Sequence, residues 1–181
     1  PILNEKTEFT MSGWVNFTES QANRTGLFGQ NDLVEFGMIN ANQMQLWTST
    51  AGSVNVSLGP TSDGWRHIVF ERIGTMLYLF VGGYRTHQWA GSNGDLFQFA
   101  DMANLNDTST KKIAIGGHGA GSGQSAAMAG LISNVRVVTG RAVYGQDAWN
   151  TNHIEPVKQI PDTKLIACSG PTVDTFYVGL D

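Results

Sequence analysis

The stretch GWRHIVFERIGTMLYLFVGGY, residues 64–84, contains two consecutive strands and the turns that bound them. The sequence Ile73-Gly74-Thr75 interrupts the first apolar run and predicts a tight turn, because glycine readily adopts the positive φ values of such turns. Every residue from Met76 to Val81 is apolar or aromatic, so both faces of the second strand are apolar. This pattern is typical of a central strand that is covered on each side. Gly82-Gly83 predicts a second tight turn, and the following residues lead away from it.

The rest of the chain shows the same alternation with period two, in about a dozen short segments separated by turn residues. No segment has a helical period, so the pattern predicts an all-β sandwich or barrel. At 181 residues the chain fits one domain, residues 1–181. Pro156 and Pro161 argue against a long helix in residues 139–162, which we expect to form an irregular connection. Residues 163–181 then supply the closing strands.

Composition excludes several classes of protein. The net charge is −4 and only 14% of the residues are charged, so the chain has no basic stripe for nucleic acid. The apolar stretches are as short as strands, so we expect no membrane insertion. No charged-then-apolar leader is present, so no secretory signal is expected. The single cysteine, Cys168, cannot form an internal disulfide, and we expect it to pack as a small apolar residue.

Two pairs of segments carry a resemblance to a known family. WRHIVFER, the turn and MLYLFVGG are similar to the central hairpin of concanavalin A-like (laminin G-like) domains, where a Trp-His-hydrophobic strand precedes one ending in Val-x-Gly. IAIGG and AGLISNVRV resemble a second pair of strands in that family. The resemblance spans about residues 7–168 and implies a jelly-roll β-sandwich of two antiparallel sheets. We also expect Arg136 to pair with Glu71 or Asp63 across the edge of the sandwich.

The C-terminal part resembles one version of this family in particular. RVVTGRAVYG, a following tryptophan and EPVKQIPDTKLIAC are similar to the tail of the version that is common in bacteriophage structural proteins. The resemblance implies a place on the virion surface, in a tail fibre, a spike or a capsid-attached appendage. It also implies contacts with other virion proteins and a homo-oligomer, for which we expect a trimer.

Patterns of catalytic residues are largely missing. Glycosidases of this fold carry two carboxylates that alternate along one strand, so that both point into the cleft and flank the sugar bond. The sequence has no such spacing, and the nearest approach, Asp32 and Glu35, would point to opposite faces of a strand. The four histidines are scattered without the spacing of a zinc site, and no Gly-x-Ser-x-Gly motif occurs. We therefore expect no enzymatic activity.

Two groups of residues are candidates for ligand binding. The first is an oxygen-rich loop, because calcium takes six to eight oxygen ligands. Its candidate calcium ligands are Asp95, Asp101, Asn104 and Asp107, with Asn93 and Asn106 nearby. The second combines aromatic rings, which stack on sugar rings, with amides, which hydrogen-bond sugar hydroxyls. Its members are Gln43, Gln45, Trp47, Tyr84, His87 and Trp89.

These observations predict a non-enzymatic module on the virion surface that binds glycans or the host surface. Two alternatives stay open. One is a capsid decoration or assembly module without any ligand, in which the aromatic residues cover the core edge or a subunit contact. The other is a secreted bacterial adhesin. Calcium is the one cofactor that the sequence suggests.

Overall fold

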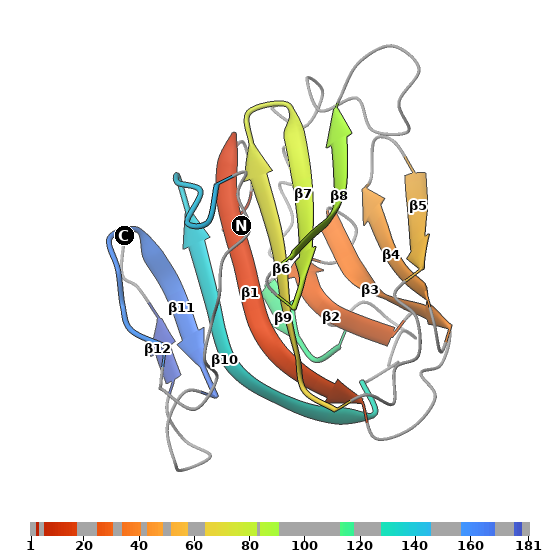
Figure 1. Cartoon of the computed structure of the whole chain (residues 1–181). Helices are drawn as coiled ribbons and strands as arrows, with labels where there is room; N and C mark the ends of the chain where they lie inside the picture. Colours follow the sequence, from red (N-terminus) through yellow and green to blue (C-terminus); the bar gives the residue numbers. More distant parts are fainter. Residues whose placement is uncertain are drawn as a thin grey trace.

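The computed structural model describes part of the sequence, and the described residues form twelve strands in two sheets (Figure 1). The described residues are 3, 6–17, 25–30, 34–40, 43–48, 52–57, 64–82, 84–90, 113–117, 128–145, 157–168 and 176–178. These residues contain no helix, and every strand pair is antiparallel. The prediction of an all-β sandwich with two antiparallel sheets is confirmed.

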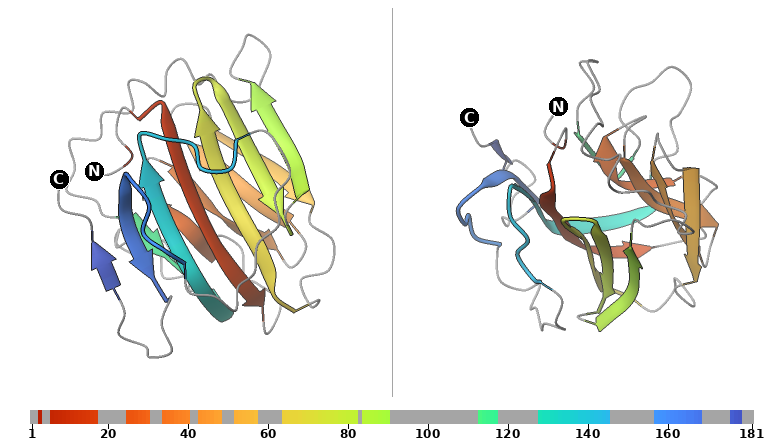
Figure 2. Two further views of the ribbon diagram at one scale, coloured as in Figure 1. Left: turned by 60° about the vertical axis from the view of Figure 1, so that its left-hand side comes forward. Right: turned by 90° about the horizontal axis from the view of Figure 1, so that it is seen from above.

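The two sheets form two layers (Figure 2). The seven-stranded sheet has the order β12-β11-β10-β1-β6-β7-β8, and the five-stranded sheet has the order β5-β4-β3-β2-β9. In chain order the strands are β1 Glu8–Phe17, β2 Thr25–Gln30, β3 Val34–Asn40, β4 Gln43–Thr48, β5 Gly52–Ser57, β6 Arg66–Ile73, β7 Met76–Val81, β8 Tyr84–Ala90, β9 Ile113–Ile115, β10 Gly130–Thr139, β11 Thr163–Ala167 and β12 Phe176–Val178.

The two turns predicted in residues 64–84 are both present. Ile73 at the end of β6 pairs with Met76 at the start of β7, and Gly74 between them has a φ of 59°. Val81 pairs with Tyr84 in β8, and Gly82 has a φ of 62°. Both glycines thus occupy the left-handed conformation that a tight hairpin turn requires.

The core lies between the sheets and follows the alternation of the strands. In β1 the residues Phe9, Met11, Val15 and Phe17 face the core, as the sequence pattern predicts. Phe70 of β6 stacks on Phe36 of the five-stranded sheet, with ring centroids 5.2 Å apart. The other core residues are Leu3, Leu27, Phe28, Met44, Leu46, Ile68, Leu77, Leu79, Val135, Val137, Leu165 and Ala167.

Gly13 of β1 lies directly against a side chain of the opposite layer. A Cβ atom at this position would lie 3.1 Å from Cζ of Phe28 and 3.1 Å from Cγ2 of Val135. The aromatic ring of the five-stranded sheet therefore fills the space that a side chain would occupy at position 13.

The hairpin of β6 and β7 is buried on both faces, as its composition predicts. Leu77 and Leu79 belong to the core between the sheets. Val69, Tyr78 and Phe80 form a second apolar cluster on the opposite face, which we call the outer face of the seven-stranded sheet. Apolar burial on both sides requires a second cover besides the five-stranded sheet.

The environment of Cys168 differs from the prediction. The residue is exposed, and it follows the last residue of β11 with a φ of 55°. Its carbonyl oxygen accepts a hydrogen bond from the backbone N–H of Asn134 at 2.9 Å. The chain thus leaves the strand at this residue, which explains why the expected packing of Cys168 in the interior is wrong.

No described helix is long and apolar enough to cross a membrane.

Candidate functional site

The outer face of the seven-stranded sheet holds most of the buried polar side chains of the described chain. Residues 140–145, which follow β10 and which we call the strap, lie against this face. Oε2 of Glu71 accepts hydrogen bonds from the backbone N–H groups of Val143 and Tyr144, at 2.8 and 3.0 Å. It also accepts one from Oγ1 of Thr10 at 2.6 Å. A carboxylate in this role satisfies backbone donors that would otherwise be buried without partners.

A second carboxylate supports the same segment. Oε2 of Glu8, at the start of β1, accepts a hydrogen bond from the backbone N–H of Ala142 at 3.3 Å. Three successive backbone donors of the strap therefore meet carboxylates from β1 and β6. Tyr144 also packs against the apolar cluster of Val69, Tyr78 and Phe80, so the strap contributes to the second cover that the hairpin requires.

Arg136 of β10 contacts the strap and not the carboxylate that the sequence suggested. Its Nη2 donates to the hydroxyl of Tyr144 at 3.1 Å, and its Nη1 donates to the carbonyl of Lys158 at 3.3 Å. Its guanidinium also lies over the Tyr144 ring, 5.9 Å from the centroid. The predicted ion pair with Glu71 is wrong, because β1 lies between β10 and β6 and Thr10 occupies the position beside Glu71. Asp63 lies outside the described residues.

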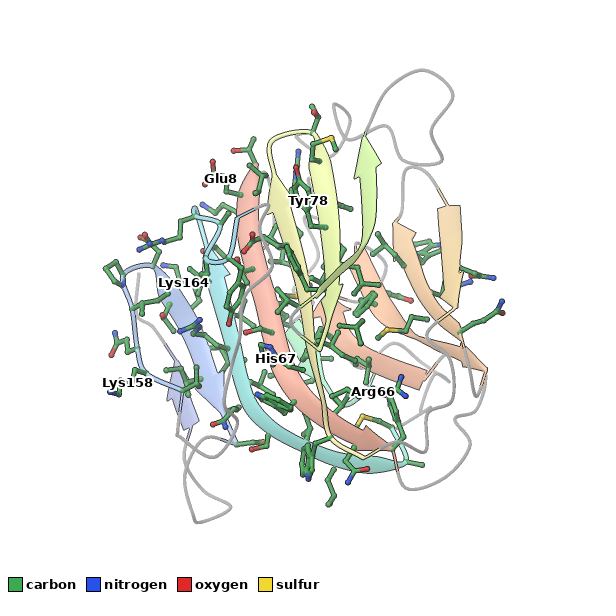
Figure 3. The ribbon with its side chains drawn as sticks, viewed as in Figure 1. Glu8, Arg66, His67, Tyr78, Lys158 and Lys164 are labelled. Atoms are coloured by element: carbon green, nitrogen blue, oxygen red, sulfur yellow. The ribbon has the colours of Figure 1, made fainter. Side chains whose placement is uncertain are left out.

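His67 of β6 lies on the seven-stranded sheet (Figure 3), and its ring contacts those of Trp14 and Tyr144. Its ring centroid is 5.1 Å from that of Trp14 and 6.2 Å from that of Tyr144. Burial lowers the pKa of His67 from 6.5 to about 3, and the positive charge of Arg136 contributes to the same shift. The imidazole is therefore neutral at physiological pH and acts as a packing group beneath the strap.

The outward face of β4 offers a different kind of surface. Gln43, Gln45 and Trp47 alternate with the buried residues Met44 and Leu46, and all three are partly exposed. Three of the six predicted glycan-binding residues thus share one strand face. Spacing with period two places them in a row, as the sequence pattern predicts.

Neighbouring strands add two residues to this face that the sequence analysis did not select. Asn55 of β5 lies opposite Gln45 and is exposed, and its Oδ1 accepts a hydrogen bond from Nε2 of Gln45 at 3.0 Å. Glu35 of β3 lies opposite Trp47 and is buried. Both positions follow from the register of β3, β4 and β5, which could have been proposed from the short turns between these strands.

The other three predicted glycan-binding residues lie in a different sheet. Tyr84, His87 and Trp89 belong to β8, the edge strand of the seven-stranded sheet, whereas β4 belongs to the five-stranded sheet. The backbone register places His87 opposite Leu79 and Trp89 opposite Leu77. The fold therefore divides the six predicted glycan-binding residues into two groups, a β4 half in one sheet and a β8 half in the other.

The predicted calcium ligands Asp95, Asp101, Asn104 and Asp107, with Asn93 and Asn106, lie outside the described residues. Among the residues that are described, no group of three or more histidine, cysteine or acidic side chains is arranged to hold a metal ion.

Comparison with known proteins places this fold in a family. The sequence matches the family model described as the concanavalin A-like lectin/glucanases superfamily over residues 2–144. The chain belongs to this superfamily. The match confirms the predicted concanavalin A-like resemblance, and the jelly-roll sandwich is the corresponding architecture. No curated protein matches the sequence significantly.

Several solved structures are similar to this chain in fold. A putative carbohydrate-binding protein from Bacteroides ovatus superposes with a TM-score of 0.58 at 11% identity, over 88% of this chain and 48% of that one. The CBM40 of the Ruminococcus gnavus IT-sialidase, bound to α2,3-sialyllactose, gives 0.54 at 13%, over 76% and 78%. Tailspike protein 2 of bacteriophage CBA120 gives 0.52 at 16%, over 76% and 23%. The chain thus spans about half of the first protein and about a quarter of the third, and identities this low establish the fold alone.

Replacing Glu71 should release the strap. In Glu71→Leu the partly buried N–H group of Tyr144 loses its acceptor and that of Val143 keeps only Oγ1 of Thr10, at 3.1 Å, so we expect the free energy of unfolding to fall by about 2 kcal/mol. Urea unfolding measures this loss, and amide hydrogen exchange should show faster exchange at these two residues. Glu8→Gln is the matched control, because Glu8 is partly exposed and makes one longer bond. Unchanged protection of both amides in Glu71→Leu would contradict the carboxylate's role.

His67 should make the protein less stable in mild acid. Its pKa is lower in the folded chain than in the unfolded chain, so unfolding takes up a proton below about pH 6.5, and stability falls as the pH decreases toward 3. Between pH 7 and pH 5 this group alone should reduce the free energy of unfolding by about 2 kcal/mol. Urea titrations at both pH values compare wild type with His67→Gln, which cannot titrate. The same pH dependence in both proteins would show that His67 is not the cause.

Proposed function

We propose that this chain is a non-enzymatic glycan-binding module and that the outward face of β4 is its contact surface. The observation that supports the proposal is the row of Gln43, Gln45 and Trp47 on one partly exposed strand face. An indole ring can stack on the face of a sugar ring, and the amides can donate to and accept from its hydroxyls. Asn55 extends the row of amides onto β5. The residues Tyr84, His87 and Trp89 of β8 remain a second candidate contact.

Similar folds support a glycan as the ligand. The Bacteroides ovatus protein is described as a putative carbohydrate-binding protein, and the Ruminococcus gnavus module is bound to a sialylated sugar. The sialylated sugar of that module is anionic, whereas the three residues of the row on β4 carry no formal charge, so the row itself suits a neutral sugar. A shallow surface of this kind gives modest affinity for each site.

The use of the carboxylates favours binding without catalysis. Glu8 and Glu71 lie on adjacent strands of one sheet face, which is the kind of pair that a glycosidase would need. Glu71 is fully buried and accepts three hydrogen bonds, and Glu8 holds Ala142. Both side chains are therefore engaged in holding the strap.

The surface of a virion is the proposed location. The tail of the sequence, from RVV to IAC, resembles bacteriophage structural proteins, and a bacteriophage tailspike is among the similar folds. The partners would be other virion proteins and cell-surface glycans. Genes for virion proteins beside this one would support the location, and a chromosomal setting among genes for secreted proteins would favour the adhesin.

Binding to an array of glycans should depend on Trp47. Trp47→Ala removes the ring that stacks on the sugar, and we expect the affinity for the best glycan to fall at least about tenfold, close to 1.4 kcal/mol. Isothermal titration with that glycan measures the change. Trp89→Ala tests the β8 half in the same way.

Trp14→Ala is the matched control, because Trp14 is also a partly exposed tryptophan but lies in the other sheet. It should leave glycan affinity unchanged, although its contact with His67 makes some loss of stability expected. A folded protein that binds no glycan on a broad array would contradict the proposal and favour the assembly module without a ligand.

Calcium remains a proposal for the loop with Asp95, Asp101, Asn104 and Asp107. If these side chains hold the ion, a millimolar excess of calcium should raise the melting temperature and a chelator should lower it, because the ion binds only the folded chain. The double variant Asp101→Asn with Asp107→Asn should lose this response. A melting temperature that neither calcium nor chelator changes would exclude the site.

A further inference from the structure

The two sheets end in four edge strands, and one of them differs from the others. β9 and β12 are only three residues long, and the pairing of β8 with β7 is shifted between Leu79 and Phe80. β5, Gly52–Ser57, is six residues long and pairs with β4 at all six positions without a shift. In the part of the chain that the structure describes, no strand pairs with the other edge of β5.

Natural proteins protect long edges, because unpaired backbone N–H and C=O groups can pair with another strand. The usual protections are a charged side chain, a proline, a bulge or a very short strand. The sequence GSVNVS of β5 has no charge and no proline, and its register has no irregularity. β8, in contrast, carries Arg85 and a shifted register. β5 is therefore the described edge strand with the fewest features that prevent pairing with another strand.

The sequence of β5 also fits a second copy of itself. Ser53-Val54-Asn55-Val56-Ser57 reads the same in both directions. Two antiparallel copies related by a two-fold axis at Asn55 would place serine opposite serine, valine opposite valine and asparagine opposite asparagine. Cross-strand pairs of like residues of these types are compatible, and no charge is brought against a like charge. A two-fold axis of this kind is the commonest symmetry of soluble oligomers.

The backbone register keeps the faces of the two sheets aligned in such a pair. Val54 and Val56 lie opposite Leu46 and Met44, which belong to the core, whereas Asn55 lies opposite Gln45 and is exposed. A two-fold pair in this register maps each face onto the same face of the second copy, because the residues that meet are separated by an even number of positions in the sequence or are identical. The positions that face the core in one copy are then continued, across the interface, by the core-facing positions of the other copy.

We propose that two copies of this chain pair antiparallel through β5, with Asn55 at the two-fold axis, and join their five-stranded sheets into one. The interface is a strand pairing of modest area, so the dimer dissociates on dilution. Insofar as the β4 face binds glycans, as proposed above, the dimer presents two such faces side by side and binds multivalent glycans more tightly than single ones.

Charge changes at the ends of the pairing test the register. In Ser53→Lys with Ser57→Lys, lysine meets lysine at both ends, and we expect the dimer dissociation constant to rise at least about tenfold. In Ser53→Lys with Ser57→Glu, lysine meets glutamate at both ends, so the dimer should be retained. Analytical ultracentrifugation over a concentration series should show twice the mass of the 19.6 kDa chain for wild type and for the second variant. Circular dichroism confirms that each variant is folded.

A disulfide tests the position of the axis. Directly opposite residues of antiparallel strands have Cα atoms about 5 Å apart, which a disulfide can bridge. Asn55→Cys in a Cys168→Ser background should therefore form a covalent dimer under mild oxidation. Gln45→Cys in the same background is the matched control, because it lies one strand further in and its Cα atoms would be about 15 Å apart.

The outcomes separate this proposal from glycan binding. A wild-type protein that is monomeric at high concentration, or trimeric, overturns the dimer, as does a Lys/Glu variant that dissociates like the Lys/Lys variant. Loss of glycan binding in Trp47→Ala leaves the ultracentrifugation result unaffected, since Trp47 lies opposite Ser53 in β4 and not at the outer edge of β5. If the protein dimerises but binds no glycan, the proposed interface stands and only its role in multivalent glycan binding is contradicted.

Discussion

Burial of the β6–β7 hairpin on both faces is the constraint on which the rest of the structure depends. The five-stranded sheet covers one face, where Phe70 stacks on Phe36. The other face carries Tyr78 and Phe80, and Tyr144 of the strap packs against their cluster. Apolar cover alone cannot hold an irregular segment, because its backbone N–H groups also need acceptors. Glu71 supplies the acceptor at the centre of the sheet, so one carboxylate connects the apolar packing of the hairpin with the path of the chain after β10.

The proposed ligand row on β4 has an acidic neighbour, Glu35, which lies opposite Trp47 and is buried. On the outer face of the seven-stranded sheet, three ionisable side chains, Glu8, Glu71 and Arg136, bond to residues after β10. Their hydrogen-bonding capacity serves the fold, and only uncharged amides and an indole ring remain in the row on β4. A chain with 14% charged residues can stabilise its sheets in this way and still present a neutral polar surface. Neutral hydroxyl-rich ligands suit such a surface better than anions do.

The sequence predicts local features well because alternation with period two is a property of neighbouring residues. Alternation predicted most of the strands, the turns at Gly74 and Gly82, and the face of β4 that carries Trp47, but residues 84–90, expected only to lead away from the second turn, form β8. The sequence failed for Arg136, since the partner depends on the order of strands in the sheet, which brings Thr10 between residues far apart in the chain. For the same reason it grouped β4 with β8, although the two strands belong to different sheets.

The absence of charge in β5 affects both the edge of the sheet and the proposed ligand face. A lysine at position 55 would protect the edge from pairing, but it would also replace an amide that accepts a hydrogen bond from Gln45 on the proposed ligand face. Asparagine keeps the amide and leaves the edge unprotected. A weak, shallow glycan site gains more from a second site nearby than from any single added contact, because linked sites raise the effective ligand concentration. The same uncharged strand can therefore serve both proposals: it completes the amide row on its outward face and offers its outer edge to a second copy.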